Sequence, residues 1–123
     1  MTTEQTVAVL GASTNPERYS NKAVRLLREH GHRVIPVNPA QEVIEGLPAM
    51  HALGDIHEAV DTLTLYMAPT HLVALTDSIV AMKPGRVIFN PGTEDPALQA
   101  RLDDAGIRWE EACTLVLLRT GQF

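Results

Sequence analysis

The stretch Thr6-Val-Ala-Val-Leu-Gly-Ala-Ser-Thr-Asn-Pro16 decides the fold. Its first five residues are mostly apolar and rich in β-branched side chains, which is typical of a buried strand in a parallel sheet. Gly11 then ends the strand, because glycine lets the chain turn sharply without a steric penalty. We therefore predict a strand over residues 6–10, a polar loop over residues 11–19 and a helix after that loop.

The helix is predicted over Ser20–His30 from the spacing of its apolar residues. They recur at intervals of three and four, so they lie on one face that packs against the sheet. Ser20 is the expected N-cap and Gly31 the expected C-terminal stop. The residues on the predicted core face are Ala23, Leu26, Leu27 and His30. The next predicted strand is Arg33–Val37, which Asn38-Pro39 closes.

The same alternation continues along the chain. Further strands are predicted over Asp61–Met67, Arg86–Asn90 and Ile107–Trp109. A helix capped by Thr70 follows the first of these strands, and its core face is Leu72, Leu75, Ile79 and Met82. Another helix follows the second strand, and its core face is Leu98, Leu102 and Ala105.

Two segments have a less regular pattern. Residues 40–58 show no clear period, and we expect a short edge strand near Gly46–Met50 and one helical turn near Ala52. Cys113–Arg119 is apolar enough for a strand or for a short helix, and its pattern does not decide between them. His30 and His32 are interpreted as a helix end and a surface turn.

Strands that alternate with helices and short turns predict a parallel sheet with helices on both faces. Right-handed crossovers make this a doubly wound sheet. The predicted fold class is therefore α/β: a doubly wound, mostly parallel, Rossmann-like sheet in three α/β/α layers. The 123 residues contain no linker, internal repeat or low-complexity segment, so residues 1–123 are expected to form a single domain.

The composition narrows the class of protein. The formal net charge of −5 argues against nucleic acid as a partner, since binding its phosphates needs a basic surface. No apolar stretch approaches the ~20 residues of a membrane span. The single cysteine, Cys113, excludes an intramolecular disulfide and suits a reducing compartment. Because the amino terminus lacks a signal-peptide pattern, we expect a cytoplasmic protein that contacts no membrane.

Ligands of doubly wound sheets bind beyond the carboxyl ends of the strands, where the strand order reverses. The loops predicted there are rich in Gly, Pro, Asn and Ser, which let the backbone turn and approach a ligand. The first loop is the best candidate for a phosphate site, because the positive end of a helix follows it. Its predicted binding residues, with those at the start of the helix, are Gly11, Ala12, Ser13, Thr14, Asn15, Arg18, Tyr19 and Lys22.

Other chemistries find less support. The dinucleotide fingerprint G-x-G-x-x-G is absent, since the next glycine after Gly11 is Gly31. Asn38 also stands where an NAD-binding acid is expected. The five histidines lack the spacing of a metal site, and no serine-hydrolase elbow occurs. We therefore predict no metal site and no catalytic residue.

Four sequence motifs, which follow one another in the same order, resemble those of the small stand-alone CoA-binding proteins. These proteins are similar to the CoA-binding domain of the succinyl-CoA synthetase α subunit. The motifs are Val7–Pro16, Val34–Pro39, Val87–Gly92 and the late Cys113. The resemblance covers Val7 to about Leu118 and implies a Rossmann-like domain whose first loop receives the CoA phosphates. It also implies that Val37, Asn38 and Pro39 border the nucleotide end, that Met67, Ala68 and Pro69 form the facing wall, and that Asn90, Pro91 and Gly92 lie towards the pantetheine arm.

Two departures from these relatives concern charge. Ala40 follows Asn38-Pro39, and Glu111-Ala112 precede Cys113, in places where relatives often carry a basic residue. The ligand implied is coenzyme A or an acyl-CoA, bound by a non-catalytic module that serves as carrier, sensor or partner subunit. Three alternatives stay open: a small NAD(P)-linked or acyl-CoA-handling enzyme, a redox protein that uses Cys113 with CoA, and a degenerate ligand site. Apolar residues 115–118 serve either the core or a homodimer, and any other protein partner is unknown.

Overall fold

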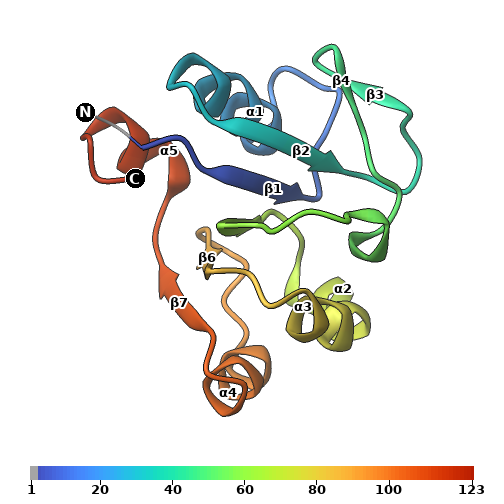
Figure 1. The fold of residues 1–123 in the computed structure, drawn as a ribbon, viewed down its shortest axis with the longest axis vertical. Helices are drawn as coiled ribbons and strands as arrows, with labels where there is room; N and C mark the ends of the chain where they lie inside the picture. Colours follow the sequence, from blue (N-terminus) through green and yellow to red (C-terminus); the bar gives the residue numbers. More distant parts are fainter. Residues whose placement is uncertain (1–2) are drawn as a thin grey trace.

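The computed structural model describes residues 3–123, whose five main strands form one sheet (Figure 1). The strands are β1 (Thr6–Leu10), β2 (Arg33–Val37), β5 (Thr62–Leu65), β6 (Arg86–Phe89) and β7 (Arg108–Glu111). Their order is β2-β1-β5-β6-β7, and every neighbouring pair is parallel. The predicted α/β, Rossmann-like fold is therefore confirmed, and the main sheet is wholly rather than mostly parallel.

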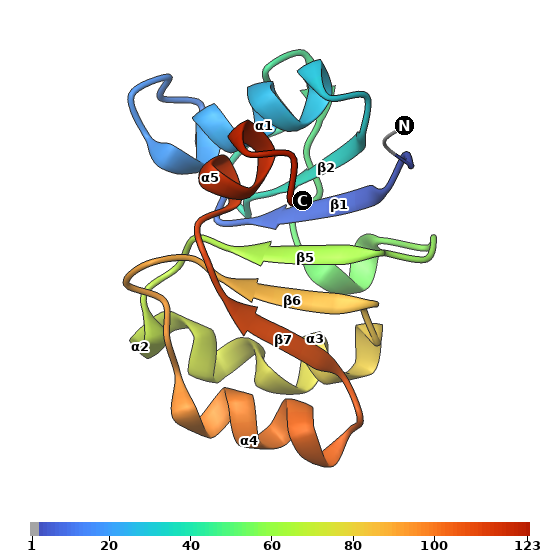
Figure 2. The same cartoon turned by 90° about the vertical axis from the view of Figure 1, so that its left-hand side faces the viewer.

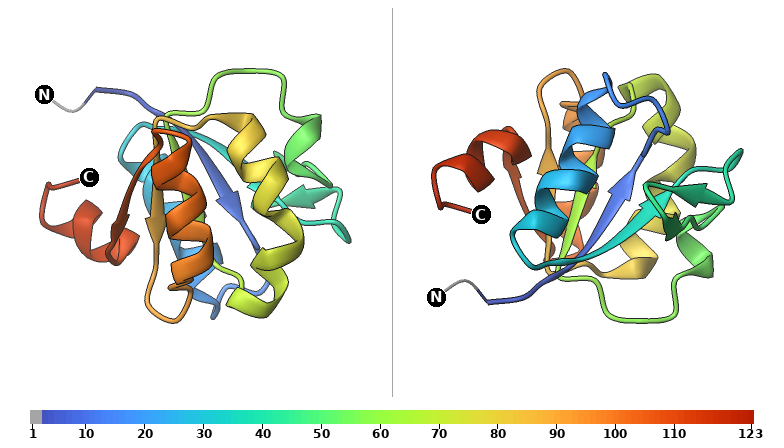
Figure 3. Two further views of the ribbon diagram at one scale, coloured as in Figure 1. Left: turned by 90° about the horizontal axis from the view of Figure 1, so that it is seen from below. Right: turned by 90° about the horizontal axis from the view of Figure 1, so that it is seen from above.

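Helices cover both faces of this sheet (Figures 2 and 3). On one face lie α1 (Tyr19–Glu29) and α5 (Thr114–Arg119), and on the other lie α2 (Pro69–Leu72), α3 (Thr76–Met82) and α4 (Pro96–Asp104). The side chains of β1 alternate between the two cores, as the pleat of a strand requires. Val7 and Val9 pack on the α1 side, whereas Ala8 and Leu10 pack on the side of α2 to α4.

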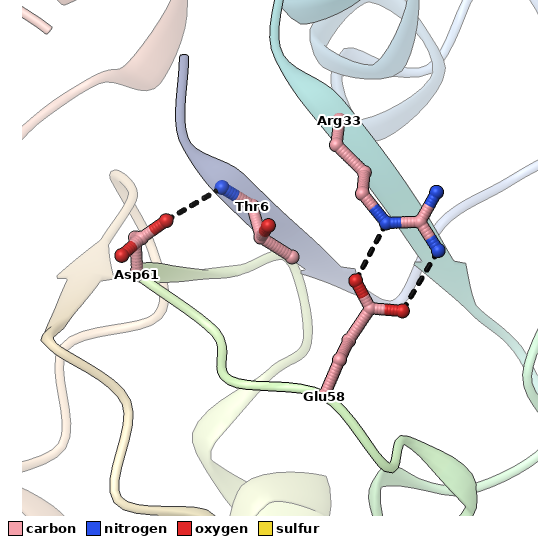
Figure 4. Close-up of polar contacts among 4 residues, drawn as sticks. All are labelled: Thr6, Arg33, Glu58 and Asp61. Carbon is pink, nitrogen blue, oxygen red and sulfur yellow. Dashed lines mark hydrogen bonds and ion pairs between the residues drawn. The ribbon is translucent and has the colours of Figure 1, made fainter. Parts of the chain in front are cut away.

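Polar contacts tie the strands together at the amino edge of the sheet (Figure 4). The backbone N–H of Thr6 donates to Asp61 Oδ2 at 2.7 Å. Arg33 donates from Nε and Nη2 to the two carboxylate oxygens of Glu58, at 2.5 and 2.7 Å. These ties lie at the edge opposite the carboxyl ends of the strands, where the ligand site is predicted.

The segment between β2 and β5 forms a small hairpin outside the main sheet. Its strands are β3 (Val43–Ile44) and β4 (Leu47–Pro48), which pair antiparallel. Both turn residues, Glu45 and Gly46, have positive φ angles of 51° and 75°. The expected edge strand near Gly46–Met50 is therefore one arm of a hairpin, and the expected helical turn is a 3₁₀ turn at Leu53–Asp55.

Two predicted helix caps are wrong. Helix α1 begins at Tyr19, so Ser20 lies inside the first turn, where it is buried. The turn before it explains this start, since Asn15 accepts hydrogen bonds from the backbone N–H groups of Glu17 and Arg18 and leads the chain into the helix. The second helix begins at Pro69 and not after Thr70, because the ring of proline presets a helical φ and its missing N–H needs no partner there.

The helix predicted over residues 70–82 is also interrupted. A 3₁₀ turn, Val73–Leu75, separates α2 from α3, although Leu72 and Ile79 are buried on the expected face. The alternatives left open for Cys113–Arg119 are resolved in favour of a helix, α5. No helix within residues 3–123 is long and apolar enough to cross a bilayer.

The interpretation of His32 as a surface residue is wrong. Its side chain is buried, its Nδ1 accepts a hydrogen bond from the backbone N–H of Gln5 at 3.1 Å, and its ring lies 5.1 Å from that of Phe123. Burial lowers the pKa of His32, since the charged imidazolium loses hydration there. Conversely, His30 and Ala105, which were assigned to core faces, are exposed.

Candidate functional site

The strand order reverses between β1 and β5. The chain leaves β1 through α1 to β2 on one side, and the next main strand, β5, lies on the other side of β1. Such a reversal opens a crevice at the carboxyl ends of the two strands. Here the crevice is bounded by the loop after Leu10 and by the residues that follow Leu65.

Gly11 makes the close approach of these two loops possible. Its φ is +89°, and a Cβ on this residue would lie 2.7 Å from the carbonyl oxygen of Tyr66. Its N–H and that of Ala12 both donate to the carbonyl oxygen of Val37, at 3.1 and 3.2 Å. The start of the first loop is therefore held against β2 on one side and against the end of β5 on the other.

The middle of the crevice is a polar cavity of about 490 Å³. The loop after β1, the first turn of α1 and the loop after β6 contribute its polar groups, which include Arg18 and the hydroxyls of Ser13, Ser20 and Thr93. Its lining residues are Gly11, Ala12, Ser13, Arg18, Tyr19, Ser20, Asn38, Tyr66, Met67, Ala68, Pro91, Gly92 and Thr93.

On the β2 side this cavity continues into a larger, mainly apolar one of about 620 Å³. The ends of β1, β2 and β5, the 3₁₀ turn at Leu53–Asp55 and helix α2 surround it. Its lining residues are Leu10, Gly11, Val37, Asn38, Pro39, His51, Ala52, Leu53, Tyr66, Met67, Ala68, His71, Ala74 and Leu75.

On the β6 side lies a smaller apolar cavity of about 250 Å³. It is lined by Tyr19, Tyr66, Asn90, Pro91, Cys113 and Leu115. The three cavities share walls, because Gly11 and Asn38 line the first two and Tyr19 and Pro91 line the middle and the small one. We therefore treat them as one cleft along the carboxyl edge of the sheet, with a polar middle and two apolar ends.

Tyr66 lines all three cavities, so its ring is a common wall of the whole cleft. Its hydroxyl oxygen is buried and makes no well-formed hydrogen bond with residues 3–123, although Thr114 and Thr64 lie near enough to affect it. Burial raises the pKa of Tyr66 to about 12, and the two threonine hydroxyls only partly oppose this effect. The phenol is therefore neutral at physiological pH.

The first loop offers fewer free donors than its composition suggests. The N–H groups of Asn15, Glu17 and Arg18 are used within the loop, in addition to the two that bind Val37. What remains is the N-terminus of α1, whose first N–H groups have no acceptor within the helix and carry its positive dipole end. An anion in the middle cavity would thus meet the start of α1 and Arg18.

Two asparagines of the predicted site have their side chains committed to the protein. Asn38 Nδ2 donates to the carbonyl oxygen of Ala12 at 2.8 Å, and its Oδ1 accepts from the N–H of Ala40 at 2.7 Å. Asn90 Nδ2 donates to Thr64 Oγ1 and to the carbonyl oxygen of Leu65, and its Oδ1 accepts from the N–H of Thr114. Both residues fix the cleft walls through these bonds.

Most of the predicted binding residues come together in the cleft. Those that line it are Gly11, Ala12, Ser13, Arg18, Tyr19, Val37, Asn38, Pro39, Met67, Ala68, Asn90, Pro91, Gly92 and Cys113. Four others, Thr14, Asn15, Lys22 and Pro69, are not among the lining residues. Lys22 instead faces a separate small cavity with Arg25 and Arg119, and its Nζ lies 5.4 Å from the centre of the Tyr19 ring.

Several lining residues were missed by sequence reasoning. Tyr66 was missed because the strand was predicted to run on to Met67, whereas β5 ends at Leu65 and leaves Tyr66 at the carboxyl edge of the sheet. His51 and Leu53 come from the aperiodic segment, and His71 comes from α2; no sequence pattern places them in the cleft. Ser20 was missed because it was assigned to a cap.

A further cavity, of about 390 Å³, lies at the amino edge of the sheet. Arg86 and Arg108 both line it. Arg86 donates from Nε to Thr62 Oγ1, lies over the ring of Phe123 and has Nη1 3.7 Å from Glu110 Oε2. Burial lowers the pKa of Arg86. This charge is already partly balanced by its neighbours, so the carboxyl edge remains the candidate ligand site.

Comparison with known proteins identifies the family of the chain. The model of the CoA binding domain family matches residues 5–119. The chain belongs to this family. The resemblance to CoA-binding proteins inferred from the four sequence motifs is therefore confirmed.

Two solved structures share the whole fold. A solved structure of an uncharacterized protein is 38% identical, with a TM-score of 0.93 over 99% of this chain and 100% of that chain. The protein cell-free ID.343 from Thermus thermophilus is 34% identical, with a TM-score of 0.90 over 98% of this chain and 91% of that chain.

Two further matches are less similar in sequence and cover less of the chain. The uncharacterized protein YneT of Bacillus subtilis (strain 168) is 26% identical over 74 residues, which are 60% of this chain and only 55% of YneT. A dinucleotide-forming acetyl-coenzyme A synthetase 1 from Ca. Korarchaeum cryptofilum is 20% identical, with a TM-score of 0.75 over 85% of this chain and 25% of that chain. At this identity the likeness to the synthetase concerns the fold alone.

Proposed function

We propose that this chain binds coenzyme A, or an acyl-CoA, along the cleft and does so as a non-catalytic module. One observation carries the proposal: the cleft has a polar middle between two apolar ends. Coenzyme A has the same order of parts, since a charged pyrophosphate joins a flat adenosine to a pantetheine arm. Membership of the CoA binding domain family supports the same ligand.

The sizes of the two end cavities give the ligand a direction. Adenosine is the wider and more rigid end and suits the cavity of about 620 Å³ beside Val37 and Pro39. The pyrophosphate then meets Arg18 and the start of α1 in the middle cavity. The thiol end points to the cavity of about 250 Å³ beside Pro91 and Cys113.

The absence of an evident catalytic pair favours a binding role over an enzyme. Within residues 3–123, no hydrogen bond joins two titratable side chains that both line the cleft, whereas a nucleophile or a general base needs such a partner. A carrier, a sensor or a subunit that presents CoA to a partner protein would need only the cleft.

The test is ligand-dependent stability, followed by calorimetric titration. The purified protein is melted with CoA, acetyl-CoA, NAD, NADP and ATP in turn. A ligand at 100 times its Kd adds about 2.7 kcal/mol of stability, which is several degrees for a chain of this size. We expect a rise with CoA or acetyl-CoA; a rise only with a nicotinamide would favour the enzyme alternative, and no rise with any ligand would indicate a degenerate site.

A charge reversal then locates the phosphates. Arg18→Glu is expected to weaken CoA binding about tenfold or more, because a charge-assisted hydrogen bond contributes about 1.5–3 kcal/mol. Arg108→Glu makes the same charge change at the opposite edge of the sheet and is the matched control. A substitution at Gly11 is unsuitable here, since its Cβ would strike Tyr66 and disturb the fold itself.

Cys113 supports a second candidate function, because it lines the cavity assigned to the thiol end. Its thiolate would attack CoA disulfide, forming a protein–CoA mixed disulfide and releasing one CoA thiolate. Intact-mass measurement should then show one added CoA after treatment with CoA disulfide, and none in Cys113→Ser. Failure of the wild-type protein to gain this mass would reject the redox function and leave the binding function in place.

A further inference from the structure

We propose that His51 and His71 bind the 3′-phosphate of CoA, so that the protein distinguishes CoA from dephospho-CoA in a pH-dependent manner. The inference rests on the proposed CoA-binding function and concerns one subsite of it. CoA and dephospho-CoA differ only by a phosphomonoester on the ribose of the adenosine. A phosphomonoester carries between one and two negative charges near neutral pH and needs hydrogen-bond donors.

The cavity assigned to adenosine supplies few such donors. Its lining among residues 3–123 contains neither lysine nor arginine, and Ala40, which follows the Asn38-Pro39 turn, carries no polar group. The titratable side chains that line it are His51, His71 and the buried Tyr66. A phosphate on the ribose would therefore be met by the two histidines or remain in solvent.

The two histidines reach the cavity from different elements. His51 follows Met50, whose backbone forms a bridge with Val37 at the end of β2, while His71 belongs to α2 after β5. Both residues are exposed, and the side chain of His51 is 50% accessible. They can therefore reorient toward a ligand without disturbing the core.

The neighbouring charged groups determine how freely the two histidines can bind a phosphate at this end of the cleft. Glu42 is the direct competitor, with its Oε1 3.0 Å from His51 Nε2 and its side chain 86% accessible. Asp55 and His57 lie on the segment after His51 but do not line the cavity, and Asp77 on α3 is paired with Arg101. No hydrogen bond engages the imidazole of His71 within the described chain.

Histidine is the side chain whose charge depends most on pH near neutrality, so a phosphate held by histidines should be bound more tightly in mild acid. Each charge-assisted hydrogen bond lost on removing the phosphate should change the affinity by about tenfold. We expect CoA to bind about tenfold more tightly than dephospho-CoA at about pH 6 and about twofold or less at about pH 8. The ratio of the two affinities cancels pH effects on the fold and on the pyrophosphate contacts, which both ligands share.

The experiment is calorimetric titration of the full chain with CoA and dephospho-CoA at both pH values. His51→Ala with His71→Ala should reduce the ratio to about one at each pH, while His57→Ala, outside the cavity, should leave it unchanged. His71→Lys should keep the ratio high at pH 8. Equal binding of the two ligands at both pH values, or a ratio that the double variant does not change, would overturn the inference, whereas failure of both ligands to bind would instead reject the proposed function.

Discussion

The carbonyl oxygen of Tyr66 lies 2.7 Å from the position that a Cβ on residue 11 would occupy. Only glycine at position 11 therefore lets the first loop contact the end of β5 without a clash. The φ of +89° adds a second reason for glycine. Gly11→Ala should lower the free energy of unfolding by about 2–4 kcal/mol, from about 1–2 kcal/mol of backbone strain and a similar cost of overpacking. Urea unfolding measures this loss.

Gly31→Ala separates the two causes of that loss. Gly31 has a similar φ of +83°, but a Cβ there would meet no atom within 4 Å. This control should lose only the backbone part, about 1–2 kcal/mol. Equal losses in the two variants would show that the contact with Tyr66 costs nothing.

Asn90 joins three elements through its buried side chain. It donates to Thr64 Oγ1 and to the carbonyl oxygen of Leu65 on β5, and it accepts from the N–H of Thr114 at the start of α5. Asn90→Ala removes these three hydrogen bonds, although Thr64 Oγ1 keeps its hydrogen bond with Thr114 Oγ1 at 2.8 Å. The loss should cost about 2–4 kcal/mol of stability in urea unfolding, because the carbonyl of Leu65 and the N–H of Thr114 lose a buried partner.

Asn15→Ala is the matched control for this substitution. The Asn15 side chain is exposed and accepts only the local N–H of Glu17. Its loss should cost less than about 1 kcal/mol. A comparable loss in both variants would mean that water enters and satisfies the groups around position 90.

The sheet was predicted well from the sequence, because strands that are buried on both faces are continuous runs of apolar residues. Residues 6–10, 33–37 and 86–89 are runs of apolar or β-branched residues that end at glycine, asparagine or proline, and all three are strands. The same turns mark the carboxyl edge, which is why most of the candidate binding residues line the cleft. Helix caps were less predictable, since a turn at Asn15 and the ring of Pro69 determine where the helices begin.

Polar residues were harder to place, because their roles depend on contacts far along the chain. Asn90 occurs in a loop that resembles a ligand-binding loop, yet its amide is used by Leu65 and Thr114. His32 is buried by Gln5 and Phe123, which lie near the two ends of the chain. No local pattern encodes such contacts.

Tyr66 should titrate far above the ordinary range of tyrosine. Its pKa is raised to about 12 by burial, compared with an ordinary value of 10.0. Below pH 10.0 the phenol is neutral in both states; between pH 10.0 and about 12 the unfolded chain loses its proton first, so stability falls as the pH rises. Ultraviolet titration of tyrosinate, after subtraction of the Tyr66→Phe curve, should place the transition near 12, and a transition near 10.0 would show an accessible phenol.

His32 should make the protein less stable in mild acid. Its pKa in the folded state is lowered from 6.5 chiefly by burial, so the folded chain resists a proton that the unfolded chain accepts. The stability that the neutral His32 contributes is therefore complete above about pH 6.5, and it is lost as the pH falls from there through the lowered pKa of the folded state. His32→Asn keeps an acceptor for the N–H of Gln5 but cannot be charged, and its stability should fall less between about pH 7.5 and pH 5.5. Urea unfolding across this range gives the comparison, with His57→Asn at an exposed position expected to follow the wild type. Parallel pH profiles for wild type and His32→Asn would show that water or local opening hydrates the imidazole in the folded protein.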